Sequence, residues 1–422
     1  MSRASFRTQI AYGMGGLSTV LPDLIIMQWL MARYVPPNAP ALLPAAWLGL
    51  LILCGRMTEG LSCPVVGHWS DTCRHRWGRR LPFLRLGILP YLAILFLLFN
   101  PPEALPQPLL LLWTLLLMEV YFFLYTAVFT PYLALLPEIA PESNDRVRLM
   151  TFQAVFIVLG TFVFAAMGES LKRWGWTAAM AGTVLLIAVF FLPVCTRVRE
   201  QHRFAGGDLP LRLGPSLRLT LGNRPFWFVL ASTSCYFYAL NGVLLLIPYW
   251  VVGYLGGNEG DVTWIMAPYL LVNLACFFLF NALAPRLGKH PLLLFTYLGT
   301  GLGLAALTLA GHLPCGTPFS QSAVLMALLG IPMAGFMVLP YPVLSDVIDY
   351  DAQRTGRRRE AVYFGVQGVA QKTAVGLSVL TFALLRYLAP DPALGLRIML
   401  LCCAAACLAA ALIFLPYPLR EK

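Results

Sequence analysis

Charged residues are scarce in this chain of 422 amino acids, of which they make up only 12%. A soluble domain carries about 25% charged residues. Here the apolar fraction is 59% and the mean hydropathy is +0.73, which excludes a water-exposed globule. Glycine has no collagen-like period, and the apolar content is too high for a disordered chain. The composition indicates a polytopic helical membrane protein whose solvent is the lipid bilayer.

Motifs for metal binding, disulfides and enzymatic chemistry are also missing. The five histidines lie in loops or at the edges of predicted spans and form no metal-ligand cluster. Seven of the ten cysteines fall inside apolar segments and only Cys315 falls in a predicted outer loop, so no disulfide framework is implied. Without a Walker-type glycine loop or a nucleophile elbow, ATP-driven pumping and enzymatic activity are poorly supported. We expect no enzyme, no resident cofactor and no bound metal.

Long apolar stretches are what the chain does contain. A helix needs about 20 mostly apolar residues to cross a bilayer. Twelve stretches qualify, at residues 9–33, 44–68, 82–100, 107–135, 149–169, 175–195, 225–254, 262–284, 290–311, 321–345, 361–386 and 392–416. The stretch 225–254 also allows another segmentation, because Pro248 can kink a helix. The sequence predicts an all-α integral membrane protein with twelve transmembrane helices.

The basic residues indicate the orientation of these helices. With both termini inside, 22 of the 30 Lys and Arg residues lie in cytoplasmic segments, as the positive-inside rule requires. The net charge of +11 is then an insertion signal, and we expect no nucleic-acid partner. Compact loops suit a bacterial inner membrane.

A polar stretch divides the chain. We expect an N-terminal six-helix half at 1–195, a cytoplasmic linker at 196–224 and a C-terminal six-helix half at 225–422. A cytoplasmic turn follows the second span of each half, which suggests internal duplication. Two such halves that rock about a midplane site characterise major facilitator transporters.

The first of these turns, GHWSDTCRHRWGRRLP at 67–82, carries the strongest motif. We expect Gly67 to permit close helix approach and Asp71 to pair with an arginine or a helix N-terminus. Such a turn can latch an inner gate by charge pairs that break as the halves rock. Alternatively, its arginines only set the topology. The candidate gating residues are Gly67, Asp71, Arg74, Arg79 and Arg80, with Asp346 and Asp349 at the end of the tenth span as opposing charges or as part of a solvated loop.

The turn resembles the signature loop of the major facilitator superfamily. Three further stretches resemble the glycoside–pentoside–hexuronide:cation symporter family, which includes the melibiose carrier. They are GRMTEGLSCPVVG at 55–67, YTAVFTPYLALLPE at 125–138 and SDVIDYDAQRTGRRREAVYFGVQGVAQK at 345–372. The resemblance implies a secondary active transporter that moves a sugar together with a cation by alternating access.

Polar residues of the second span are candidates for coupling. Arg56, Glu59, Ser62 and Cys63 share one helix face, and an ionised group in a membrane normally faces a cavity and has a partner. In the melibiose carrier two acids on this face and a hydroxyl from the fourth span bind the cation. Here Glu59 matches the first acid and Thr126 the hydroxyl, but Cys63 replaces the second acid.

Losing that acid changes the expected coupling ion. Na⁺ needs several oxygen ligands, whereas a single carboxyl group in a low-dielectric pocket can bind a proton. We therefore expect H⁺ in preference to Na⁺. The alternative is a structural ion pair between Arg56 and Glu59.

A second buried charge, Lys372, lies about midway along the eleventh span. Gln367 and Gln371 lie nearby, and glycines at 365, 368 and 376 on its face are expected to let neighbouring helices approach. The family has a lysine at this position near its cation site. The resemblance implies that Lys372 pairs with Glu59 across the halves and releases it on protonation. A lysine that snorkels outward is the alternative.

The sugar site of the melibiose carrier is not retained. Its acid in the fourth span, its arginine in the fifth and a nearby tryptophan correspond to Phe129, Gln153 and Leu133. The same galactoside specificity is therefore not expected. The candidate residues for binding a small polar solute are Asp23, Arg56, Glu119, Tyr125, Gln153, Asn241 and Gln371.

Two other functions stay open beside sugar symport by a monomer. Lysophospholipid carriers resemble the same family, and Phe129 and Leu133 suit an acyl chain. A non-transporting sensor built on the transporter fold would not need Glu59 and Lys372.

Overall fold

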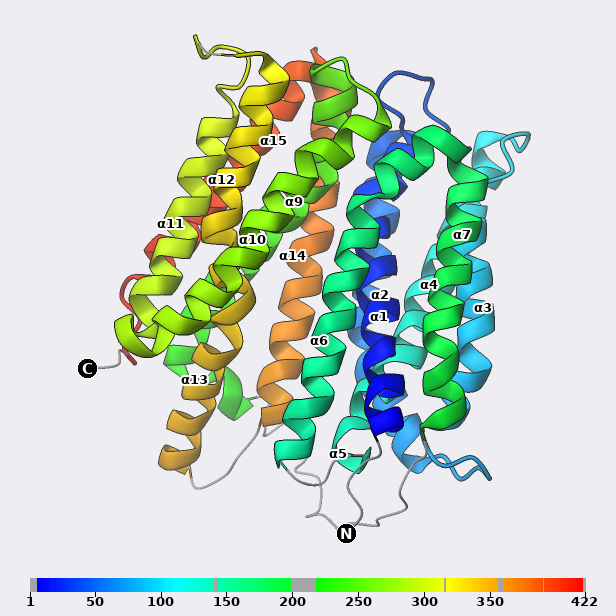
Figure 1. The fold of residues 1–422 in the computed structure, drawn as a ribbon, viewed down its shortest axis with the longest axis vertical. Helices are drawn as coiled ribbons and strands as arrows, with labels where there is room; N and C mark the ends of the chain where they lie inside the picture. Colours follow the sequence, from blue (N-terminus) through cyan, green and yellow to red (C-terminus); the bar gives the residue numbers. More distant parts are fainter. Residues whose placement is uncertain are drawn as a thin grey trace. The chain divides into compact units, whose positions relative to one another are not determined.

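The computed structural model describes residues 6–139, 143–198, 218–314, 316–355, 360–389 and 391–419. The chain divides into two compact units, Met1–Gly206 and Gly207–Lys422. Unit 1 contains α1 (Phe6–Tyr34), α2 (Ala45–Thr72), α3 (Leu81–Phe99), α4 (Gln107–Ala134), α5 (Leu136–Ile139), α6 (Ser143–Ala165) and α7 (Met167–Arg197). Unit 2 contains α9 (Arg224–Pro248), the π-helix η1 (Tyr249–Tyr254), α10 (Glu259–Leu287), α11 (Lys289–Leu307), α12 (Pro318–Val338), α13 (Pro340–Thr355), α14 (Glu360–Leu388) and α15 (Pro392–Phe414) (Figure 1).

The helices confirm the all-α membrane fold. Among the described residues, eleven helices are long and apolar enough to cross a membrane, and α6 adds the shorter apolar segment Leu149–Ala165. Each of the twelve expected spans coincides with helical structure. A bilayer offers no water to satisfy backbone groups, so long apolar runs close their hydrogen bonds within helices.

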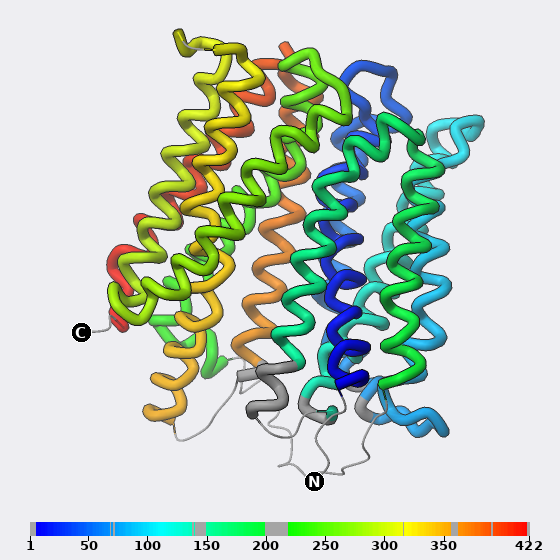
Figure 2. Tube along the Cα trace, in the orientation of Figure 1, coloured from blue at the N-terminus to red at the C-terminus, as the bar shows by residue number. Residues whose placement is uncertain are grey.

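The junction of the fifth and sixth expected spans differs in detail from the sequence prediction. The chain bends between α6 and α7 at Ala166, and α7 is itself broken at Gly175 (Figure 2). The φ of Gly175 is 72°, a value that would be strained for a residue with a Cβ. The residues between these two points carry Glu169, Lys172 and Arg173. A short helical segment with three charged residues therefore joins the two spans.

Prolines interrupt two spans of unit 2. Pro248 has no N–H to donate to the preceding turn, and the six residues after it form η1, where Leu255 N donates to Trp250 O at 2.9 Å. Pro340 likewise begins α13 directly after α12 ends, within the expected span 321–345. The irregularity anticipated at Pro248 is present, whereas the break at Pro340 was not predicted.

The two units pack their helices in the same pattern. In unit 1, α1 packs on α6 and α7, α4 packs on α2 and α3, and α3 packs on α7. In unit 2, α9 packs on α14 and α15, α12 packs on α10 and α11, and α11 packs on α15. These five pairings correspond one to one in chain order, which supports an internal duplication.

Glycines bring α1, α2, α4 and α6 close together in unit 1. A Cβ on Gly16 of α1 would lie 2.5 Å from the main-chain oxygen of Gln153 in α6. A Cβ on Gly55 of α2 would lie 2.3 Å from the Phe122 ring of α4. These contacts fix the helices that carry the polar residues described next.

Three other glycines have no close neighbour. Among the described residues, a Cβ at Gly67, Gly365 or Gly368 would have no atom within 4 Å beyond its local chain. The close approach of helices expected at these positions is therefore not present within either unit.

Candidate functional site

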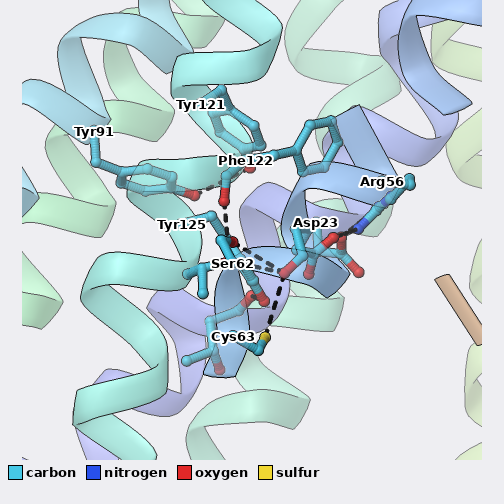
Figure 3. Close-up of polar contacts among 11 residues, drawn as sticks. Asp23, Arg56, Ser62, Cys63, Tyr91, Tyr121, Phe122 and Tyr125 are labelled. Carbon is cyan, nitrogen blue, oxygen red and sulfur yellow. Dashed lines mark hydrogen bonds and ion pairs between the residues drawn. The ribbon is translucent and has the colours of Figure 1, made fainter. Parts of the chain in front are cut away.

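A buried arginine joins two acids in unit 1 (Figure 3). Arg56 of α2 donates from Nη2 to Asp23 Oδ1 of α1 and from Nη1 to Glu59 Oε2 of α2, both at 2.6 Å. The side chain of Arg56 is 1% exposed, that of Glu59 is 4% exposed and that of Asp23 is 36% exposed. We call these three residues, Asp23, Arg56 and Glu59, the acid triad. Glu59 is its buried acid, and Asp23 is its accessible acid.

Arginine is suited to this position because its planar guanidinium can serve two carboxylates from different nitrogens. Its Cζ also lies 4.8 Å from the centroid of the Phe122 ring, a cation–π contact that stabilises a desolvated positive charge. Its Nε is buried and has no hydrogen-bond partner among the described residues. With both acids ionised, the triad has a formal charge of −1.

The other expected coupling residues of unit 1 gather around the main-chain oxygen of Glu59. Ser62 Oγ donates to it at 3.1 Å, Cys63 Sγ at 3.3 Å and Thr126 Oγ1 of α4 at 3.4 Å. Thr126 also contacts the main-chain oxygen of Phe122 at 3.1 Å. The hydroxyls of Ser62 and Thr126 therefore both donate to main-chain oxygens beside the triad.

Aromatic residues pack beside the triad. Tyr91 of α3 and Tyr121 of α4 have their hydroxyls 3.1 Å apart, and Tyr125 donates to the main-chain oxygen of Thr19 at 3.4 Å (Figure 3). Phe129 lies edge-on to Tyr91, with 5.5 Å between the ring centroids, and is only 2% exposed. Phe129, which stands where the melibiose carrier has its sugar-binding acid, is therefore a packing residue here.

Two further candidates of unit 1 lie in other contacts. Glu119 of α4 accepts a hydrogen bond from Thr58, not from a member of the triad. Gln153 of α6 is 4% exposed and packs against Gly16 of α1, and its Oε1 has no hydrogen-bond partner in the part of the chain that the structure describes. Gln153 is thus a buried acceptor rather than a substitute for a charged arginine.

The candidates of unit 2 lie on two helices. Asn241 of α9 donates from Nδ2 to the main-chain oxygen of Phe237 at 3.0 Å. On α14, Gln371 and Lys372 are half-buried, and Gln367 is buried with an Oε1 that no described residue contacts by a hydrogen bond. The predicted pairing of Lys372 with Glu59 joins the two units and stays a prediction.

The gating candidates belong to separate contacts within each unit. Arg80 donates from Nη1 to the main-chain oxygen of Ala134 at the end of α4, where helix carbonyls lack partners. Asp346 of α13 accepts from Lys289 Nζ of α11 at 2.8 and 2.7 Å. Arg74 and Asp349 are exposed, Arg79 is half-buried, and the side chain of Asp71 lies outside the described part of the chain.

Sequence reasoning missed Lys289, Tyr91 and Tyr121. Lys289 lies in the second cytoplasmic turn, at 284–291, so the correspondence between the two turns could have identified it as a gating partner. Tyr91 and Tyr121 lie in long apolar runs and give no signal before the packing of α3 on α4 is known.

Among the described residues, eleven candidate spans and the shorter apolar helix α6 lie in two similarly packed units, and charged groups are buried inside one of them. This architecture is typical of a multi-pass membrane transporter. The chain matches the profile of the MFS/sugar transport protein family over residues 11–419. It belongs to this family, the glycoside–pentoside–hexuronide:cation symporters of the major facilitator superfamily, and is not an enzyme.

Relatives and solved structures agree with this assignment. The chain is 24% identical to the glucuronide carrier protein homolog of Escherichia coli, covering 99% of this chain and 93% of the other. It is 21% identical to the isoprimeverose transporter of Lactiplantibacillus pentosus, with coverages of 87% and 77%. The fold resembles a crystal structure of a D-xylose-proton symporter with a TM-score of 0.74 and 16% identity, covering 98% and 97% of the two chains.

Proposed function

We propose that this protein moves a neutral sugar together with a proton, and that Glu59 carries the proton. The observation that carries the proposal is the buried triad, in which one guanidinium faces two carboxylates at 2.6 Å. Protonation of Glu59 changes the formal charge of the triad from −1 to zero. Since uncompensated charge is unfavourable inside a membrane, the protonated and deprotonated triads favour different surroundings.

The geometry around Glu59 favours H⁺ over Na⁺. A sodium ion needs several oxygen ligands, but the Glu59 carboxylate is engaged by Arg56. Cys63 supplies a thiol where the melibiose carrier has its second acid. A proton needs one carboxylate oxygen only.

The accessible edge of the triad supports a sugar as the solute. Asp23 is the most exposed member and can accept hydrogen bonds from sugar hydroxyls, while the half-buried Tyr125 ring can pack against a sugar face. A triad with a formal charge of −1 repels a carboxylate, so we infer a neutral glycoside or pentoside rather than a hexuronide. The names of the relatives do not decide between the two, since one is an isoprimeverose transporter and another is a glucuronide carrier protein homolog.

The lipid alternative loses part of its support. It depended on Phe129 and Leu133 as residues that suit an acyl chain, but Phe129 packs against Tyr91, Tyr125 and Phe191 inside unit 1. Only Leu133 is exposed.

Sugar accumulation in membrane vesicles with an imposed pH or Na⁺ gradient tests the proposal. We expect the wild type to accumulate a neutral sugar under the pH gradient alone. Glu59→Gln should only equilibrate that sugar, because its amide cannot exchange the coupled proton. Glu103→Gln is the matched control, since Glu103 also pairs with an arginine, Arg33 at 2.7 Å, but is exposed. Accumulation by Glu59→Gln at the wild-type level, or accumulation driven only by Na⁺, would refute the proposal.

A further inference from the structure

A groove runs between α3 and α7 in unit 1, and none of the triad residues that the proposed function uses is among those that line it. Figure 1 shows the two helices side by side, and they pack against each other. The groove has a volume of about 600 Å³, within the range of ligand sites. Its lining is Arg85, Ile88, Leu89, Leu92, Ala188, Val189, Leu192, Cys195 and Thr196.

The polar groups of the groove lie at one end. Arg85 Nε donates to the main-chain oxygen of Cys195 at 2.8 Å, which places the start of α3 beside the last turns of α7. From Arg85 to Leu92 the groove follows α3 for seven residues, about 10 Å of helix. This is most of one leaflet, since a bilayer core is roughly 30 Å thick.

The charge at this end lacks a counter-charge. Arg85 and Arg76 lie 5.1 and 5.3 Å from the centroid of the Trp77 ring. Over the part of the chain that the structure describes, neither arginine has a carboxylate oxygen within 4.0 Å. Among the described residues, only the Nε–H of the five N–H donors of Arg85 makes a hydrogen bond, and that one caps the C-terminal end of α7.

We propose that this groove binds one anionic phospholipid, with the phosphate on Arg85 and an acyl chain along the apolar wall. The charge selects an anion, because guanidinium groups bind phosphate oxygens through paired N–H donors. The apolar wall selects a lipid over a free anion or a sugar, since seven of the nine lining residues have no charged or hydroxyl side chain. Leu89 and Val189 are exposed where the groove opens, which leaves it accessible to lipid from the side. Trp77 adds the amphipathic ring that favours the headgroup level.

Native mass spectrometry of the purified full chain in a non-ionic detergent tests the proposal. Phosphatidylglycerol and phosphatidylethanolamine with identical acyl chains are added in parallel, and inorganic phosphate is added alone. We expect retention of phosphatidylglycerol in preference to phosphatidylethanolamine, together with a higher apparent melting temperature. Inorganic phosphate alone should give neither effect.

Variants of the groove distinguish binding of the lipid headgroup from binding of the acyl chain. Arg85→Gln should weaken phosphatidylglycerol binding about fivefold, the effect of one basic residue near an anionic lipid, and Arg85→Lys should recover part of the loss. Ala188→Phe should fill the groove and weaken both lipids equally. Arg173→Gln, at an exposed arginine paired with Glu169, is the control and should bind as the wild type does.

Three outcomes would overturn the proposal. They are equal retention of both lipids by the wild type, unchanged binding in both Arg85→Gln and Ala188→Phe, and protection by inorganic phosphate as strong as that by phosphatidylglycerol. The last would indicate a free-anion site. Ala188→Phe leaves Arg85 in place, so it keeps the test decisive if Arg85→Gln fails to fold.

Discussion

At the scale of single residues, Arg56 explains how two acids can lie inside an apolar bundle. Each of its terminal nitrogens meets one carboxylate, and the Phe122 ring covers its face. Removing one partner of a buried ion pair leaves the others uncompensated, which costs about 3–5 kcal/mol. An exposed ion pair contributes only about 0–1 kcal/mol, because water solvates the separated charges.

Replacing Arg56 should therefore destabilise the protein far more than replacing an exposed arginine. We expect Arg56→Gln to lower the apparent melting temperature strongly and to abolish sugar accumulation. Arg56→Lys should be intermediate, since one ammonium group retains the charge but cannot present two separate nitrogens to Asp23 and Glu59. Thermal unfolding in detergent and vesicle transport measure both effects. Arg173→Gln serves as the control, and an Arg56→Gln variant as stable as that control would contradict the role given to Arg56.

Phe129 makes a second test at this scale. Restoring the acid of the melibiose carrier with Phe129→Asp should not create a galactoside site, because the side chain is 2% exposed and packed among aromatic rings. A carboxyl group there would be buried without a designed partner. We expect a reduced yield of folded protein and no galactoside uptake. Leu133→Trp restores another residue of that carrier at an exposed position and should be tolerated. Galactoside transport by Phe129→Asp would show that the position faces the solute.

At the scale of helices, close contacts depend on which neighbour a glycine meets. A methyl group on Gly16 would meet the main-chain oxygen of Gln153 at 2.5 Å, and a backbone atom cannot move aside as a flexible side chain can. Gly16→Ala should force α1 and α6 apart and cost about 1–3 kcal/mol, as overpacking usually does. Gly182→Ala in α7 is the control, because no atom lies within 4 Å of its Cβ position. Equal apparent melting temperatures for the two variants would contradict the packing of α1 on α6.

The sequence predicted the helices well because each span needs a long apolar run whatever its neighbours are. Local breaks were harder to predict. A proline such as Pro248 indicates an irregular helix directly, because it lacks an N–H. The break at Gly175 depends on a φ of 72°, which the presence of a glycine does not by itself reveal.

The site was predicted only in part, for a similar reason. Helical spacing brings Arg56 and Glu59 together, but the contact of Arg56 with Asp23 joins α1 to α2 and needs the tertiary fold. The burial of Phe129 likewise follows from aromatic rings on α3 and α7.

At the scale of the whole molecule, successive loops of each unit lie alternately at the two ends of the helices. In unit 1 the start of α1, the segment between α2 and α3 and the end of α7 lie on one side of the helices (Figure 1). The segments between α1 and α2 and between α3 and α4 lie on the other side. In unit 2 the segment between α10 and α11 and the segment between α11 and α12 likewise lie at opposite ends of the helices. Basic residues concentrate in the first set, including Arg74, Arg79 and Arg80 between α2 and α3.

This asymmetry predicts that both termini are cytoplasmic, since Lys and Arg are retained on the cytoplasmic side of a membrane. Alkaline phosphatase, which is active only outside the cytoplasm, should be active when fused after Pro102 or His312. It should be inactive when fused after Cys73 or Gly288. Green fluorescent protein at the same four positions should give the opposite pattern, which controls for expression. Phosphatase activity after Cys73 and Gly288, with none after Pro102 and His312, would reverse the orientation. It would also place the Arg85 end of the α3–α7 groove in the outer leaflet.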